Sequence, residues 1–425
     1  MRVLLVGSGG REHALAWALA RSPLLERLDA APGNPGIATL ARCHPVPVSD
    51  LEGMTRLAQE LAVDLVVVGP EAPLVSGLAN RLSEAGIGVF GPSAAAAQIE
   101  GSKAFAKSVM EAAGVPTARF TICDTVSAAH AAIAEADGAV VVKADGLAAG
   151  KGVVVCSSAA EAHAAVAAAL VDGRFGASGR RVLIEERLEG EELSLLALCD
   201  GERAIPLAPA QDFKRIFDGD EGPNTGGMGS YSPVPGAGDP HELAAVVHQP
   251  LVDELRRRGT PFHGVLYAGL MLSADGPRVI EYNARFGDPE TQAVLPRLRG
   301  DLLELLRRAA QPGGLEGATL EFADDAAVTV VLASAGYPAS SSSGDVISGL
   351  DDVPAGVEIT HAGTARRKDG AIVTAGGRVL NVTGVAPDPA AARQRAYDAA
   401  AMIDFDGKQL RTDIAARAVD AVTAH

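Results

Sequence analysis

Short apolar runs alternate with helical patterns over the first hundred residues of the chain. The runs "RVLLVG", "VDLVVVGP" and "GIGVFGPS" each contain Gly or Gly-Pro at or near their ends, and amphipathic stretches over 11–22 and 74–85 lie between them. This alternation is typical of parallel strands joined by helical crossovers. It predicts a Rossmann-like α/β domain over residues 1–101.

The pattern changes after residue 101. The run "AVVVKADGLAAGKGVVVCS" sets two β-rich segments around a Gly-rich turn, which predicts an antiparallel hairpin. A helix over 158–171 and a strand in "RRVLIEERL" follow, then a long Gly-rich loop over 211–230 and strands over 263–273 and 277–283. Short strands and a helix over 388–402 end the chain. We expect an α+β domain over 102–324 with a mobile subdomain over about 116–188, and a small mixed α/β domain over 325–425.

Composition narrows the function classes. A chain of 425 residues is long enough for several cores, and its formal charge of −16 disfavours nucleic acid and membrane surfaces as partners. The four cysteines are far apart, and no apolar run approaches the length of a membrane span. We therefore expect a cytoplasmic, soluble enzyme that acts on small molecules.

The glycines of "VGSGGREHA" follow the first predicted strand. Gly7 and Gly9 match the start of a dinucleotide-binding fingerprint, but its sixth position is Glu12 and the second strand lacks a terminal acid. This disfavours an NAD-dependent oxidoreductase, which we retain as an alternative. The start of the next helix can bind another phosphate, or the segment is an ordinary strand-to-helix turn.

Two further motifs suggest a nucleotide site. In "VVVKADGLAAGKGVVV", Lys143 ends a strand and a turn containing Lys151 could close over phosphates, although a flexible hairpin tip has the same composition. In "VLIEERLEGEELSLL", Glu185 and Glu192 could contact adenine and ribose, or form a solvated acidic turn.

A third motif, "PRVIEYNARFGDPE", suggests a metal site. Glu281 and Asn283 are two residues apart on a predicted strand and so share a face, where they offer hard oxygen ligands to Mg²⁺ or Mn²⁺. Arg285 is expected on the same face. A salt-bridged strand end explains the charges but not their alignment.

In this order, with Lys103 before them, the motifs resemble the ATP-grasp superfamily, and no P-loop sequence is present. Longer strings, including "APGNPG", "GPNTGGMGSYSP", "RFGDPETQ" and "HAGT", resemble the phosphoribosylamine–glycine ligase family from residue 1 to about 415. The resemblance implies a monomeric enzyme that activates glycine with ATP as glycyl phosphate and joins it to 5-phosphoribosylamine. The products are glycinamide ribonucleotide, ADP and phosphate, as in the second step of de novo purine synthesis.

The resemblance also implies site residues. Arg285 is the expected catalytic residue, and Glu281 and Asn283 are the expected Mg²⁺ or Mn²⁺ ligands. The expected ATP-binding residues are Lys103, Lys143, Gly146, Lys151, Gly152, Glu185, Glu186 and Glu192. The expected substrate-binding residues are Gly9, Gly10, Asn34, Glu71, Asp212, Lys214, Thr225 and Gly226.

The chain departs from the family pattern at several positions. Phe213 stands where many members have His, Ala284 replaces a common Cys, and Ala415 replaces a usual Gly. Gly269, twelve residues before Glu281, leaves no earlier acidic metal ligand, so no third protein ligand is assigned. The alternatives are another ATP-grasp ligase or carboxylase and a noncatalytic nucleotide-binding regulator.

Overall fold

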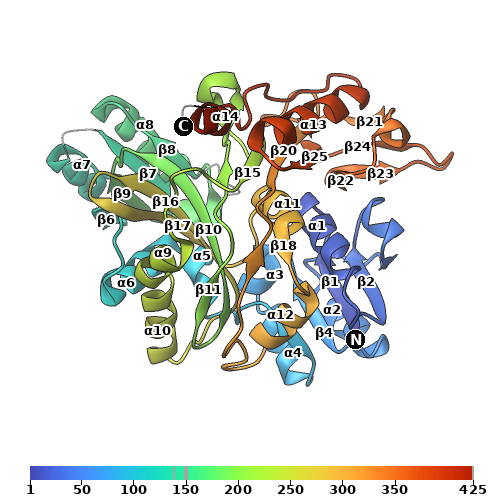
Figure 1. Ribbon diagram of the computed structural model, residues 1–425. Helices are drawn as coiled ribbons and strands as arrows, with labels where there is room; N and C mark the ends of the chain where they lie inside the picture. The colour runs from blue at the N-terminus through green and yellow to red at the C-terminus, as the bar shows by residue number, and fades with distance from the viewer. Residues whose placement is uncertain (137–138, 148–151, 424–425) are drawn as a thin grey trace.

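The computed structural model describes residues 1–136, 139–147 and 152–423. Its strands form several sheets, and helices pack against them. The N-terminal unit lies at one side, the C-terminal strands lie above it, and a separate α/β lobe lies opposite (Figure 1). This is the multidomain α/β and α+β architecture expected from the sequence. Within the described residues, no helix is both long and apolar enough to cross a bilayer.

The N-terminal unit is a parallel sheet in the order β3-β2-β1-β4-β5. The predicted helix over 74–85 is in fact two helices, because Gly77 takes a left-handed conformation with φ of 94° and interrupts it. The elements of this unit are β1 (Arg2–Gly7), α1 (Gly10–Leu19), β2 (Arg27–Pro32), η1 (Ile37–Thr39), β3 (Arg42–Cys43), α2 (Leu51–Glu60), β4 (Leu65–Val68), α3 (Glu71–Val75), α4 (Leu78–Glu84) and β5 (Gly88–Phe90).

A central antiparallel sheet in the order β11-β10-β16-β17 packs against the N-terminal unit through a shared core. The predicted strands over 263–273 and 277–283 are confirmed as an antiparallel pair in which Gly269 lies opposite Glu281. The central elements are α5 (Gln98–Gly101), α6 (Lys103–Ala113), β10 (Glu191–Asp200), β11 (Ala204–Pro206), α9 (Pro240–Val247), α10 (Gln249–Arg257), β16 (His263–Ser273), β17 (Gly276–Asn283), α11 (Glu290–Val294), β18 (Leu298–Arg299), α12 (Leu302–Ala309) and β19 (Glu321–Phe322).

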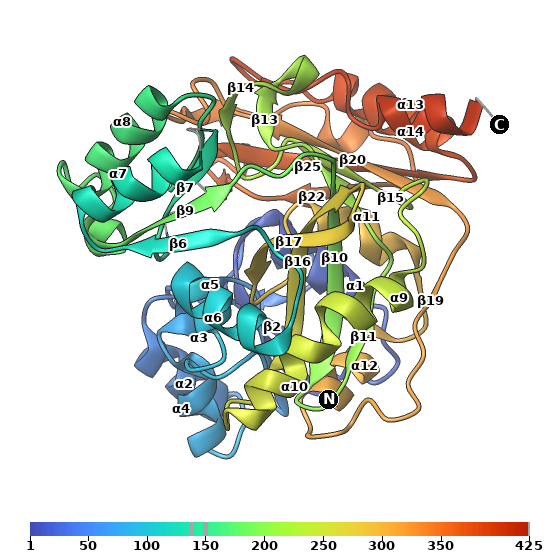
Figure 2. The same ribbon diagram turned by 90° about the vertical axis from the view of Figure 1, so that its left-hand side faces the viewer.

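The lobe at the left of Figure 1 is an antiparallel sheet in the order β6-β9-β7-β8, with two helices on one face. The predicted hairpin is confirmed, since Val141 pairs with Val155. The lobe has a core of its own, and Figure 2 shows it projecting from the central sheet. Its elements are β6 (Phe120–Cys123), α7 (Val126–Glu135), β7 (Val140–Ala144), β8 (Val153–Val155), α8 (Ala159–Leu170) and β9 (Val182–Glu186).

The C-terminal sheet has the order β12-β15-β20-β25-β22 and is covered by α13. Two of its strands come from the segment 211–230 and its continuation, so the prediction of one long loop there was wrong. Backbone pairing defines these strands, rather than an apolar pattern, because β15 pairs with β20 and β12 pairs with β15. The elements are β12 (Gln211–Asp212), β13 (Arg215–Phe217), β14 (Glu221–Asn224), β15 (Gly229–Ser232), β20 (Ala326–Ala333), β21 (Ser343–Val346), β22 (Val357–His361), β23 (Thr364–Arg366), β24 (Ile372–Ala375), β25 (Arg378–Ala386), α13 (Pro389–Met402) and α14 (Ala416–Thr423).

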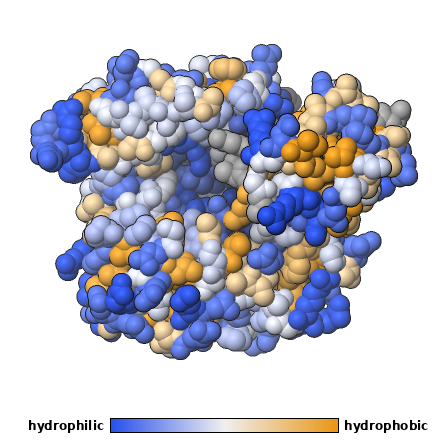
Figure 3. All heavy atoms as spheres, turned by 180° about the vertical axis from the view of Figure 1, so that it is seen from behind, coloured by the Kyte–Doolittle hydropathy of each residue, from blue (hydrophilic) through white to orange (hydrophobic). Residues whose placement is uncertain are grey.

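The four cysteines are free, as expected, and three of them are buried. The surface is hollowed near its middle when seen from behind, and hydrophilic residues line much of the hollow (Figure 3).

Candidate functional site

The lobe meets the central sheet at a buried lysine. Lys143 Nζ on β7 lies 3.0 Å from Glu185 Oε2 on β9 and donates a hydrogen bond of 2.9 Å to the Ile280 carbonyl on β17. Both charged side chains are nearly inaccessible to solvent. Two predicted ATP-binding residues are therefore in contact and sit beside the predicted metal-binding strand.

Sequence reasoning missed a second lysine at this point. Lys107, one turn after Lys103 on α6, lies 3.0 Å from the same Glu185 oxygen and also donates to Thr117 at 2.8 Å. Burial lowers the pKa of Lys107 to about 8, against the opposing charge of Glu185. The other oxygen of Glu185, Oε1, has no hydrogen-bond partner among the described residues. The repeated Lys in "SKAFAK" was the only sequence signal for it.

The remaining predicted ATP contacts do not all lie close to this pair. Lys103 Nζ donates to the Gly146 carbonyl at 3.1 Å, and burial lowers its pKa. Glu186 instead faces outward, where it lies 2.7 Å from both Arg119 and Arg278. Gly152 is buried, whereas Lys151 and most of the predicted closing turn lie outside the described residues.

Glu281 and Asn283 share one face of β17, as their spacing predicts. Burial opposes ionisation of Glu281, but the charges of Lys214, Lys143 and Lys103 outweigh it, so the pKa of Glu281 lies below its usual value. An ionised carboxylate beside an amide oxygen fits Mg²⁺, which takes few protein ligands and keeps water or phosphate for the rest.

Gly269 lies opposite Glu281 and has no side chain that could serve as an earlier acidic metal ligand. A Cβ atom there would lie 3.4 Å from Glu281 Cγ, so this is the position from which an earlier acid would reach the metal face. Within the described residues no group of three or more His, Cys, Asp or Glu side chains forms a metal cluster.

Arg285 is not on the strand. β17 ends at Asn283, so the predicted alternation does not extend to Arg285, which lies in the following turn. Its Nε atom is 3.3 Å from Glu71 Oε2 and its Nη2 atom is 3.2 Å from Glu100 Oε1. Glu71, predicted to contact substrate, therefore anchors this guanidinium. Glu100 was missed, since nothing in "QIEGSK" distinguishes it from a helix-surface acid.

A second acidic group lies near Arg285, where the charge of Glu290 helps to raise the pKa of the guanidinium. Burial, with the nearby charge of Glu290, raises the pKa of Asp212 to about 7 although Lys214 lies 3.8 Å away. Lys214 also contacts Glu192 directly. The carboxylates outweigh burial and hold the pKa of Lys214 above its usual value.

Two neutral side chains complete this acidic group and were not predicted. Ser194 Oγ on β10 lies 2.9 Å from the Tyr267 hydroxyl on β16 and donates to Glu290 Oε1 at 3.2 Å. Burial raises the pKa of Tyr267 above its usual value. These hydroxyl and carboxylate oxygens form one buried hydrogen-bonded group.

The first glycine loop is closed to a dinucleotide. The Glu12 side chain is 2% exposed, accepts a 2.6 Å hydrogen bond from Gly9 N–H and is paired with Arg11. A Cβ atom at Gly7 would lie 2.5 Å from Glu12 Cγ, so this carboxylate fills the turn. The side chain of Glu12 thus occupies the place that the third glycine of the fingerprint keeps open, which argues against the NAD alternative.

The other predicted substrate contacts surround the start of α1. Asn34 uses both amide hydrogens, donating to the Ser8 carbonyl at 2.9 Å and the His361 carbonyl at 2.7 Å. Gly10 lies against Asn381 and Gln292, whose side-chain oxygens have no partner among the described residues.

Arg378, which was not predicted as a site residue, links the loop 225–227 to Asp288, near the start of α1. Arg378 lies 3.1 Å from Asp288 and its guanidinium contacts the Gly226 carbonyl. Thr225 Oγ1 donates to the Lys214 carbonyl at 2.9 Å, which links this loop to the acidic group. Asp288 Oδ2 would lie 3.6 Å from a Cβ atom at Gly9.

Three family models match consecutive parts of the chain. They are described as the phosphoribosylglycinamide synthetase N domain over residues 1–100, the ATP-grasp (A) domain over 101–291 and the C domain over 327–417. The chain is similar to a phosphoribosylamine–glycine ligase of Streptomyces coelicolor, with 54% identity over 99% of this chain and 100% of that protein. A phosphoribosylamine–glycine ligase of Brucella melitensis is 51% identical over 99% of both chains.

Solved structures agree with these matches. The crystal structure of a phosphoribosylamine–glycine ligase from Thermotoga maritima superposes with a TM-score of 0.85 at 34% identity, covering 97% of this chain and 100% of that one. A biotin carboxylase from Campylobacter jejuni, at 14% identity and a TM-score of 0.71 over 96% of this chain and 92% of its own, shares the fold. The chain therefore belongs to the phosphoribosylglycinamide synthetase family.

Proposed function

We propose that the chain catalyses the ATP-dependent ligation of glycine to 5-phosphoribosylamine, giving glycinamide ribonucleotide, ADP and phosphate. The observation that carries this proposal is the buried cluster of opposite charges around Glu281 and Arg285. The positive charges of Lys214, Lys143, Lys103 and Arg285 act on Glu281, and the charge of Glu290 acts on both Arg285 and Asp212. Full-length similarity to phosphoribosylamine–glycine ligases selects the substrates.

ATP is assigned to the junction of the lobe and the central sheet. Lys143 and Lys103 supply positive charge for its phosphates, and the free Oε1 atom of Glu185 is an acceptor for an amino group such as that of adenine. Glu281 and Asn283 would hold Mg²⁺ or Mn²⁺. The bound ion would neutralise phosphate charge during transfer.

The substrate glycine is assigned to the acidic group formed by Asp212 and Glu290. A carboxylate resists attack by an amine, so we infer that the γ-phosphoryl group first passes to the glycine carboxylate to form glycyl phosphate. Arg285 stabilises negative charge on the transferred group, because Glu71 and Glu100 hold its guanidinium in place. Asp212 and Glu290 are oxygen acceptors for the glycine ammonium group, and Ser194 links Glu290 to the Tyr267 hydroxyl.

The ribosylamine is assigned to the first unit. The amide groups at the start of α1 and the Arg378 guanidinium are suited to its 5-phosphate. Its amine then attacks the acyl phosphate, forms the C–N bond of the amide and releases phosphate. Closure of the lobe over the site would protect the acyl phosphate from water.

A coupled assay of ADP release tests the proposal, with ribosylamine generated in situ. ADP release should require both glycine and ribosylamine, and Arg285→Ala should reduce kcat by at least about 100-fold. Release of ADP without dependence on ribosylamine would contradict the assignment. Release that depends on bicarbonate instead of glycine would favour a carboxylase.

A further inference from the structure

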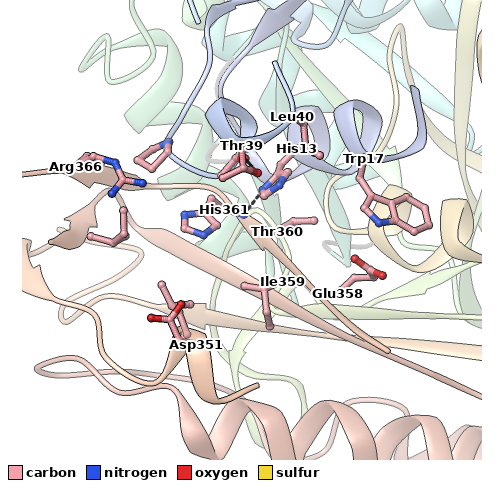
Figure 4. A pocket seen from close by; sticks show the side chains of 14 residues that line it. His13, Trp17, Thr39, Leu40, Asp351, Glu358, Ile359, Thr360, His361 and Arg366 are labelled. Atoms are coloured by element: carbon pink, nitrogen blue, oxygen red, sulfur yellow. Dashed lines mark hydrogen bonds between the residues drawn. The ribbon is translucent and has the colours of Figure 1, made fainter. Parts of the chain in front are cut away.

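A cavity outside the assigned site lies between α1 and the C-terminal sheet. Its volume is about 370 Å³, which falls within the range of small-molecule sites. Its walls come from α1, the segment after β2, and β22 to β24, and it includes none of the residues assigned to ATP, metal or glycine. Figure 4 shows side chains of α1 and β22 facing one another across it.

Two histidines define the polar wall of the cavity. The His361 backbone N–H donates to His13 Nδ1 at 2.7 Å, so the imidazole of His13 carries its proton on Nε2. Burial lowers the pKa of His13 to about 3 and of His361 to about 4, so both rings are neutral near pH 7. His13 Nε2–H has no hydrogen-bond partner among the described residues, which makes it a free neutral donor at the cavity.

Gly36 leaves room for the imidazole rings of His13 and His361. A Cβ atom at Gly36 would lie 2.3 Å from His13 Cε1 and 2.7 Å from His361 Cδ2. Any larger residue would push the imidazoles away from their positions. The absence of a side chain here therefore maintains the donor geometry.

Farther along α1 and β22, the same cavity has acceptors and flat apolar surface. Trp17 and Glu358 line it there, and burial raises the pKa of the Glu358 carboxyl group. Asp351 is a second carboxylate at the cavity, and Arg366 is its one guanidinium among the lining residues. The aliphatic lining residues are Leu40, Leu350, Ile359 and Ile372.

We propose that this cavity is a second ligand site, which binds an amino-substituted nitrogen heterocycle of the nucleobase or nucleoside class. A neutral ring donor, two carboxylate acceptors and apolar walls match a planar molecule with ring nitrogens and an exocyclic amino group. A phosphorylated sugar is disfavoured, because two carboxyl groups face one guanidinium. A ligand bound here would contact the N-terminal unit and the C-terminal strands at once.

The chain contains one tryptophan, and it lines this cavity, which gives the test a direct signal. We would titrate the full-length protein with adenosine and record Trp17 fluorescence, with the ATP site saturated by a non-hydrolysable ATP analogue. Adenosine should change the fluorescence saturably and raise the thermal midpoint, because a ligand that binds the folded state stabilises it.

Two variants separate this site from any other. Leu350→Phe fills the cavity and should weaken adenosine binding at least tenfold, whereas Val246→Phe on the exposed face of α9 should leave it unchanged. ADP release from the two variants reports whether each is folded. Absence of saturable binding, binding that persists in Leu350→Phe, or a response to ribose 5-phosphate in place of adenosine would each overturn the proposal.

Discussion

The guanidinium of Arg285 lies 3.2 Å from the carboxylate of Glu100, a residue more than 180 positions earlier in the chain. The Ala284 N–H also donates to Glu100 at 2.7 Å, so one carboxylate holds both the side chain of Arg285 and the backbone before it. Glu100 belongs to the short helix that follows the N-terminal sheet. This contact fixes the central turn relative to the N-terminal unit.

Glu100 should titrate near neutral pH. Burial raises its pKa to about 7 from a usual value of 4.5, although Arg285 opposes the shift. A difference titration of wild type against Glu100→Gln should show one proton released near pH 7. Because the folded pKa is the higher one, stability should fall as pH rises from about 4.5 to 7, and Glu100→Gln should remove this slope.

Glu71→Gln is the matched control for Glu100. Arg285 and Arg11 outweigh burial there, so the pKa of Glu71 lies below its usual value. Because the charge of Glu71 raises the pKa of Glu100, the difference titration of Glu71→Gln should show only a shift of the Glu100 step to lower pH and not the loss of that step. The same release in both variants would mean that Glu100 is not the titrating group.

Replacing Lys107 should impair both stability and ATP use. Lys107→Met leaves Glu185 with one cation and removes a buried ion pair, a change that costs about 3 kcal/mol of unfolding free energy. The KM for ATP should rise more than kcat falls, because Glu185 loses its orientation. Thermal denaturation and steady-state kinetics measure these effects.

The exposed ion pair of Arg56 with Glu52 provides a control. Arg56→Met should change unfolding free energy by no more than about 0.5 kcal/mol. An equal loss in Arg56→Met and Lys107→Met would show that burial of the Lys107 pair is unimportant. Lys107→Arg, which keeps the charge, should retain part of the ATP affinity.

The Mg²⁺ concentration that the enzyme needs for activity should depend on the side chains of Glu281 and Asn283. Glu281→Gln should raise the Mg²⁺ concentration for half-maximal activity at least about tenfold, since it removes the one carboxylate of the donor pair. Asn283→Asp should lower that concentration by adding negative charge. Binding of Mn²⁺ measured by electron paramagnetic resonance should follow the same order.

Asp275→Asn tests whether any acid nearby has this effect. Asp275 is exposed in the turn between β16 and β17, away from the proposed ligands. Its variant should keep the wild-type dependence on Mg²⁺. A larger effect from Asp275 than from Glu281 would contradict the metal assignment.

Phe213 should be replaceable by the histidine common in the family. The Arg411 guanidinium lies 4.9 Å from the Phe213 ring centroid and is paired with Asp220 and Asp413. Phe213→His should lose about 1 kcal/mol of stability through the weaker cation–π contact, with kcat within about threefold of wild type. Phe213→Ala should lose about 3 kcal/mol. A large loss of kcat in the stable His variant would show that the ring has a role beyond packing.

Local patterns were sufficient where the interacting residues are close in sequence. Alternation of apolar runs and helices predicted the N-terminal parallel sheet, and the spacing of Glu281 and Asn283 predicted their common face. The strands within 211–230 were missed, because these short segments are defined by backbone pairing. The strand β15 pairs with β20, about a hundred residues later, and β12 then pairs with β15.

Residue types and their spacing along the chain were enough to identify the family, the order of the chemical motifs and the groups available for phosphate and metal binding. Three relationships could not be predicted in this way and became visible in the folded chain: Glu71 and Glu100 anchor Arg285, Lys107 shares Glu185 with Lys143, and Glu12 fills the first glycine turn. These relationships depend on burial and on contacts between distant segments, which pair charges that look like ordinary surface residues in the sequence.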